Sequence, residues 1–234
     1  LERHVIAPFE IPEHWSRIRA MDWGSARPFS VGWYAVSDGT RPGIARGALV
    51  KYRAWYGMRE AEHNVGVKMT AEEVAHGIRE RETERELRKI EDAVLDPSAF
   101  TQDGGPSISE RMQTQQVLFR PADNKRVARA GALGGWDQLR ARLKGDGVAP
   151  LILFFSTCVH TIRTLPALQH DELKPEDVDT ESEDHASDET RYACMSRPIV
   201  HDAPEKPDPK FPQHRTFNQL VEHARKRRIQ EAEA

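Results

Sequence analysis

Residues 18–36, IRAMDWGSARPFSVGWYAV, contain two strand candidates separated by a short polar turn. The first candidate, residues 18–22, ends in an aspartate. In the second, residues 29–36, large apolar side chains occupy every other position, which is typical of a strand with one buried face. Turn signals at residues 38–43 precede a third candidate at 48–55. The sequence therefore predicts three consecutive strands that short turns make antiparallel.

The rest of the chain alternates between helix and strand signals. Thr70 with Glu73, and Ser107 with Glu110, match the capping box that begins a helix, and the first helix is expected to reach residue 90. Further strands are predicted at 93–95, 117–119 and 151–155, and further helices at 124–144, 158–168 and 183–195. This order predicts an α/β fold: a mixed central sheet with three antiparallel leading strands at its edge and helices on both faces.

Three parts are expected along the chain. Residues 1–15 are interpreted as an irregular lead-in, residues 16–197 as the folded domain, and residues 198–234 as a Pro-rich and then basic tail. The chain begins without an initiator Met or a signal peptide. We therefore expect it to be cut from a longer protein, with the lead-in joining it to an upstream domain.

Composition excludes several classes of protein. Hydrophobic residues make up 38% and charged residues 30%, enough for one core with a polar surface, and the net charge is only −3. Charge is segregated: residues 171–189 hold ten acids, whereas residues 210–228 hold six Lys or Arg. Two cysteines without a CxxC pair argue against a zinc or disulfide framework. No apolar run is long enough to predict a membrane span.

Acidic residues stand at the ends of three predicted elements. Asp22 ends the first strand and Asp96 ends the strand at 93–95, while Asp184, His185 and Asp188 open the last predicted helix and share one of its faces. Carboxylates that converge repel one another unless a cation lies between them, and oxygen ligands suit Mg²⁺ or Mn²⁺. Each acid alone also fits a turn, a cap or a solvated face, so these patterns leave both interpretations open.

Three further acids in this region, Glu181, Glu183 and Glu189, are expected to belong to a solvated acidic face.

The order of these residues resembles the nuclease domain of phage and prophage terminase large subunits. The matching stretches are residues 21–29 (MDWGSARPF), 33–36 (WYAV), 95–97 (LDP), Arg126, Gly135-Trp136, Leu165-Pro166 and 183–188 (EDHASD) followed by Arg191-Tyr192. The resemblance implies an RNase H-like (retroviral integrase-like) endonuclease that uses two Mg²⁺ or Mn²⁺ ions. It implies that Asp22 binds both ions, with Asp96, Asp188 and His185 completing the site. Some relatives use two adjacent acids, which would favour Asp184.

The same resemblance implies a biological setting. Such a domain cuts concatemeric viral double-stranded DNA into unit lengths during genome packaging, in the cytoplasm of the bacterial host. Its partners would be DNA, the terminase small subunit, the portal protein and an upstream ATPase domain of the full-length chain. No GxxxxGK[ST] phosphate-binding loop occurs here, so we expect no ATP hydrolysis by this chain alone.

Basic residues near the third acidic segment are candidates for DNA binding: Arg126, Lys125, Arg129 and Arg140. Phosphate contacts of this kind give sequence-tolerant binding, although a solvated amphipathic helix fits the same pattern. Two other functions stay open. One is another RNase H-like nuclease of the resolvase or transposase type; the other is a non-catalytic module that docks on DNA or the portal.

Overall fold

A computed structural model describes residues 2–128, 133–179 and 182–199 of the chain. Within these residues seven strands form one sheet. The strands are β1 (Val5–Ile6), β2 (Arg17–Asp22), β3 (Ser30–Val36), β4 (Leu49–Tyr56), β5 (Ile90–Leu95), β6 (Arg120–Pro121) and β7 (Ile152–Phe155). The α-helices are α1 (Ala71–Glu80), α2 (Glu84–Leu87), α3 (Ile108–Thr114), α4 (Gly135–Lys144), α5 (Val159–Thr164) and α6 (His185–Ser196). Short 3₁₀ turns lie at Glu2–His4, Pro97–Phe100 and Leu165–Ala167.

The strands lie in the order β1-β7-β4-β3-β2-β5-β6. β3 runs antiparallel to β2 and β4, and each of the other neighbouring pairs is parallel. The mixed α/β sheet with three antiparallel leading strands is therefore confirmed. These strands are not at the edge, however, because β7 and β1 extend the sheet beyond β4. All seven residues of β3 are buried, as expected of a central strand covered on both faces.

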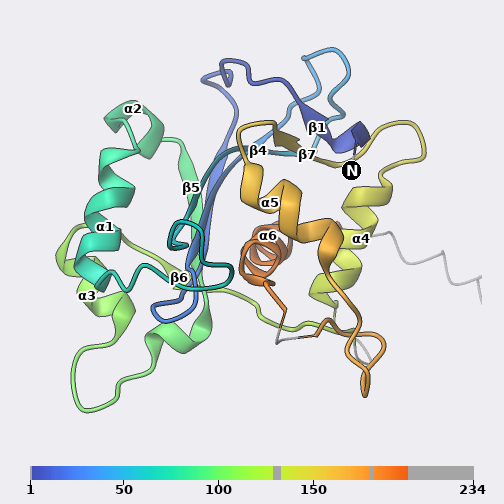
Figure 1. The fold of residues 1–234 in the computed structure, drawn as a ribbon. Coiled ribbons are helices and arrows are strands. Elements are labelled where there is room, and N and C mark those ends of the chain that lie inside the picture. The colour runs from blue at the N-terminus through green and yellow to red at the C-terminus, as the bar shows by residue number, and fades with distance from the viewer. Residues whose placement is uncertain (1, 129–132, 180–181, 200–234) are drawn as a thin grey trace, which may run out of the picture. The chain divides into compact units, whose positions relative to one another are not determined.

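Helices cover both faces of the sheet. In Figure 1, α1, α2 and α3 lie on one side of it, and α4, α5 and α6 lie on the other. Successive side chains of a strand point to opposite faces, so neighbouring residues of β3 enter different cores. Trp33 packs with Val74 and Ile78 of α1, whereas Tyr34 packs in the core that includes Tyr192 and Cys194 of α6.

Both predicted capping boxes are present, at Thr70 and at Ser107. The helix that begins after Thr70 ends at Glu80, so the prediction that it continues to residue 90 is wrong. Thr83 starts a separate helix, α2, because its hydroxyl accepts a hydrogen bond from the backbone N–H of Glu86 at 3.1 Å. The residues beyond α2 then join β5.

Two other predicted elements are displaced. The strand expected at 117–119 is instead the two-residue β6, since Gln116 adopts φ 61° and the chain turns there at the end of α3. A mostly helical segment interrupted near Gly134 was expected over 124–144; among the described residues of this range, helix is present only at Gly135–Lys144. Before it, the backbone carbonyls of Lys125 and Arg126 accept hydrogen bonds from the first N–H groups of α4, at 2.8 and 3.0 Å.

The segment expected as an irregular lead-in contributes to the sheet. β1 pairs in parallel with β7, and Trp15 is buried with its indole N–H donating to Asp38 at 2.9 Å. Most of the predicted tail, residues 200–234, lies outside the described residues. Among the helices that are described, none has the length and apolar character needed to cross a bilayer.

Candidate active site

The ends of two parallel strands bring the first two predicted acids to one edge of the sheet. Asp22 is the last residue of β2, and Asp96 directly follows its parallel neighbour β5. The backbone N–H of Asp96 donates to the carbonyl of Met21 at 3.0 Å. The carboxylate of Asp96 accepts hydrogen bonds from the backbone and hydroxyl of Ser98, so it also caps the following turn. The structure therefore places Asp96 beside Asp22 while giving it a local structural role.

The start of α6 brings the third acidic segment to the same edge. Asp184 precedes the helix, His185 is its first residue and Asp188 lies within its first turn. His185 Nδ1 is 3.0 Å from Asp22 Oδ2, which joins α6 to the end of β2. Asp184 occupies the N-cap position, yet its side chain accepts no capping hydrogen bond. Its carboxylate is therefore directed to other partners.

Burial dominates the electrostatics of this cluster. Asp22, Asp184 and Asp188 are each less than a tenth exposed. Burial raises the pKa of Asp22 to about 7, with the charges of Asp188 and Asp96 adding to the rise and the His185 hydrogen bond opposing it. Burial and the charge of Asp188 likewise raise the pKa of Asp184 to about 6. Burial lowers the pKa of His185, but the contact with Asp22 outweighs that effect and the pKa is raised.

Arg126 supplies positive charge to this cluster. Its guanidinium lies 2.7 Å from Asp177, 3.0 Å from Asp188 and 3.6 Å from Asp184, measured between the nearest nitrogen and oxygen atoms. The Trp136 indole N–H donates to the same oxygen of Asp177 at 2.8 Å. Burial lowers the pKa of Arg126, but the charges of Asp188 and Asp177 outweigh burial and raise it. Arg126, a predicted DNA contact, is thus engaged by three aspartates.

The donor set suits a hard divalent cation, because carboxylate oxygens predominate among the side chains at this edge. The ligand set is not assembled, however. Among the described residues, no three His, Cys, Asp or Glu side chains form a ready metal site. The reason is visible in the contacts: Asp184 and Asp188 face Arg126, and His185 Nδ1 faces Asp22.

The remaining predicted DNA contacts lie near this cluster or outside the described residues. A hollow of about 440 Å³ is lined by Arg126, Trp136 and Arg140, among others. Lys125 and Arg140 are 59% and 48% exposed, and within the described part of the chain they form ion pairs only with nearby acids, Asp123 and Asp137. Their side chains are therefore accessible to a large ligand. Arg129 lies outside the described residues.

Glu183 is not part of a solvated face. Its carboxylate receives two hydrogen bonds from Arg163 of α5 and one, at 2.9 Å, from the hydroxyl of Tyr56 at the end of β4. His160 stacks on the Tyr56 ring with 4.7 Å between ring centroids. These residues border the cluster on the β4 side. Sequence reasoning missed them because contacts between distant segments leave no local pattern.

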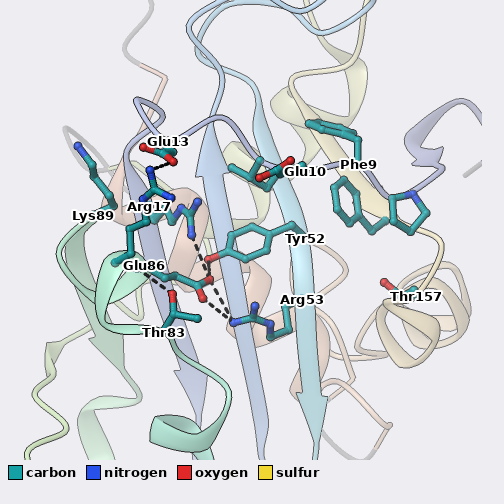
Figure 2. Close-up of a pocket in the computed structure, with 14 residues that line it drawn as sticks. Phe9, Glu10, Glu13, Arg17, Tyr52, Arg53, Thr83, Glu86, Lys89 and Thr157 are labelled. Atoms are coloured by element: carbon teal, nitrogen blue, oxygen red, sulfur yellow. Dashed lines mark hydrogen bonds and ion pairs between the residues drawn. The ribbon is translucent and has the colours of Figure 1, made fainter.

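A separate cavity of about 480 Å³ lies on the other face of the sheet (Figure 2). Arg17 and Arg53 point toward the buried carboxylate of Glu86, which also accepts a hydrogen bond from the Tyr52 hydroxyl (Figure 2). Arg17 is the first residue of β2 and Asp22 is the last. This cavity is therefore remote from the acidic cluster, and its charged groups hold α2 against the sheet.

Solved structures share this arrangement of strands and helices. The nuclease domain of the P22 large terminase has 20% sequence identity and a TM-score of 0.56, over 84% of this chain and 88% of that domain. This is the fold of a phage terminase nuclease domain. The large terminase nuclease of thermophilic phage G20c, solved with bound cobalt, has the same terminase nuclease fold with a TM-score of 0.51 at 10% identity, over 83% of this chain and 93% of that one.

A longer large terminase, from another thermophilic bacteriophage, matches with a TM-score of 0.61 and 18% identity. The match covers 84% of this chain and 42% of that protein, so the chain spans about two fifths of the longer terminase. No protein-family model and no curated protein matches the chain. The predicted RNase H-like terminase nuclease fold is therefore confirmed, and the roles of individual residues stay predictions.

Proposed function

We propose that this chain is a metal-dependent endonuclease of the terminase type, which cuts double-stranded viral DNA during genome packaging. One observation carries the proposal. In a fold shared with the P22 and G20c nuclease domains, Asp22, Asp184, His185 and Asp188 gather at one edge of the sheet, with Asp96 beside them. Buried acids with strongly raised pKa values, such as Asp22 and Asp184, are typical of a functional site.

Asp22, Asp96 and Asp188 are the carboxylates we expect to hold two Mg²⁺ or Mn²⁺ ions, with Asp184 as an alternative third acid. The cobalt bound to the G20c nuclease supports a divalent ion. The chemistry such ions supply when bound is activation of a water and neutralisation of charge on the leaving oxygen. His185 fixes the orientation of the Asp22 carboxylate through Nδ1. Arg126 balances the charge of Asp184 and Asp188 in the metal-free protein.

The DNA would lie across the acidic edge and contact Lys125, Arg126 and Arg140, with Arg129 in the same basic segment. Contacts to phosphate are independent of sequence, which suits an enzyme that cuts unrelated DNA. The partial coverage of the longer terminase supports an upstream ATPase domain in the full-length protein. We place the working enzyme in the cytoplasm of a phage-infected or lysogenic bacterium, with the terminase small subunit and the portal protein as partners.

Plasmid cleavage tests this proposal. The purified chain is incubated with supercoiled plasmids of unrelated sequence and Mn²⁺, Mg²⁺ or EDTA, beside Asp22→Asn and an Arg79→Ala control on α1. We expect nicking and linearisation with either metal, none with EDTA and none by the Asp22 variant, while the control stays active. Metal-independent cutting, or full activity of Asp22→Asn, would exclude the proposed site.

The same assay separates the alternatives. A resolvase or transposase type of nuclease would cut branched or site-specific substrates in preference to plain plasmid DNA. A docking module would bind DNA without cutting it under any metal, and Asp22→Asn would leave its binding intact.

A further inference from the structure

A buried ion pair joins the middle of the sheet to the helix that carries the candidate site. Lys51 of β4 and Glu189 of α6 are both fully buried and form an ion pair. The Glu189 carboxylate also accepts hydrogen bonds from the hydroxyls of Tyr34, at 2.7 Å, and Ser30, at 3.3 Å. Lys51 donates to the Thr161 hydroxyl at 2.8 Å. This network therefore connects β3, β4 and α5 to a single position on α6.

The backbone of β3 is shaped to receive the Glu189 side chain. A Cβ atom added at Gly32 would lie only 2.1 Å from Glu189 Oε1. The carboxylate therefore packs directly on a strand that has no side chain at this point. Because Glu189 is held on all sides, rotation or sliding of α6 would break several of its contacts.

Glu189 follows the proposed metal ligands closely on α6. His185 is four residues earlier, one turn away on the same side of the helix, while Asp188 is rotated by about 100° from Glu189. With Glu189 fixed against β3, His185 reaches Asp22 at the end of β2 and Asp188 turns toward Arg126. The orientation of both residues thus depends on where Glu189 is anchored.

We infer that the buried pair of Glu189 and Lys51 is a positioning device, which sets the rotation of α6 so that His185 contacts Asp22 and Asp188 lies at the acidic edge, where its side chain can leave Arg126 to bind a metal ion. This inference rests on the proposed nuclease function and extends it to residues that contact neither metal nor DNA. Residues that orient metal ligands affect metal affinity by about 10- to 100-fold.

A second buried ion pair, on the opposite face of the sheet, provides a matched control for the pair of Lys51 and Glu189. Arg19 and Glu82 form a second ion pair, 4% and 3% exposed, and the Trp33 indole donates to Glu82 at 2.6 Å. Trp33 and Tyr34 are neighbours on β3, and each donates to one of the two buried carboxylates. Glu82 stands outside α6, so its loss should reduce stability without moving the candidate ligands.

The experiment compares Glu189→Gln, the double variant Lys51→Met/Glu189→Met, and Glu82→Gln with the wild type. The double variant removes both buried charges together, so that it folds even if Glu189→Gln does not. Mn²⁺ affinity is measured by calorimetry, thermal stability by circular dichroism, and the His185–Asp22 contact by the NMR shifts of the His185 ring nitrogens. The last two readouts need no metal.

We expect both Glu189 variants to bind Mn²⁺ at least about tenfold more weakly than the wild type and to shift the His185 ring signals. Glu82→Gln should lower the melting temperature while leaving Mn²⁺ affinity and the His185 signals unchanged. Wild-type affinity and signals in the double variant, or an equal loss of affinity in Glu82→Gln, would overturn the inference. If the wild type binds no Mn²⁺, the proposed function fails, and the His185 signals alone still test the positioning.

Discussion

His185 Nδ1 lies 3.0 Å from Oδ2 of Asp22, although the two residues are 163 positions apart in the chain. The contact joins the first residue of α6 to the last residue of β2, and both side chains are largely buried. Asp184 and Asp188 reach the same edge through their contacts with Arg126. An arrangement of this kind keeps negative charge in a region from which water is largely excluded.

Replacing Asp22 should stabilise the metal-free protein. The folded pKa of Asp22 is raised to about 7 from 3.8, so the contribution of this carboxyl group to stability is fully present below pH about 4, falls as the pH rises from there, and is lost above pH about 7. Asp22→Asn should therefore exceed the wild type in unfolding free energy by on the order of 1–3 kcal/mol at pH 8, with no gain near pH 4. Urea unfolding in EDTA at both pH values measures this; equal stability at pH 8 would contradict it.

Removing the Arg126 guanidinium should make the stability of the folded protein depend more strongly on bound metal ions. Arg126→Gln leaves Asp177, Asp184 and Asp188 without their shared cation, so we expect a loss of about 2 kcal/mol in EDTA. Added Mn²⁺ should then raise the melting temperature more in the variant than in the wild type. Arg111→Gln, which breaks an ion pair with Glu72 on the other face, is the control. A smaller Mn²⁺ effect in Arg126→Gln would refute this account of Arg126.

Lys125 and Arg140 should contribute to DNA affinity through phosphate contacts. In an Asp22→Asn background that prevents cutting, Lys125→Ala and Arg140→Ala should each reduce the slope of log affinity against log salt by about 0.9. Fluorescence anisotropy with duplexes of two unrelated sequences measures the slope. The exposed Arg79 on α1 is the control and should leave it unchanged. Unaltered slopes for both variants would place the DNA elsewhere.

Gly32 should tolerate no side chain. The Cβ of Gly32→Ala would meet the Glu189 carboxylate, so we expect the unfolding free energy to fall by about 2 kcal/mol or more. A Cβ at Gly105 has no atom within 4 Å, so Gly105→Ala should change stability by less than about 0.5 kcal/mol. Urea unfolding compares the two variants. Similar stability of Gly32→Ala and the wild type would mean that Glu189 can move away freely.

Local patterns were sufficient to predict most of the fold. Alternation over residues 29–36 predicted β3, the apolar run at 151–155 predicted β7, and the capping boxes at Thr70 and Ser107 predicted two helix starts. The helix ends were harder to predict. A charged segment after Glu80 fits a continued helix as well as a turn, and the local cap that Thr83 provides for Glu86 was overlooked.

The surroundings of the candidate site were not predictable from local patterns. Glu189 was expected on a solvated face because it follows a run of acids, yet it is fully buried against Lys51, 138 residues away. A lysine within a strand and a glutamate within a helix carry no signal of their pairing. Glu183 was misread for the same reason, because Arg163 and Tyr56 reach it from other elements.

Asp22, Asp96 and Asp188 are the residues we propose to hold the metal ions that cut DNA. Anomalous diffraction from crystals of the chain soaked in Mn²⁺ tests this assignment most directly. We predict two peaks about 3.5–4 Å apart, with Asp22 between them and Asp188 turned away from Arg126. Well-ordered crystals with no anomalous peak within coordinating distance of Asp22, or with Mn²⁺ bound only elsewhere, would contradict it.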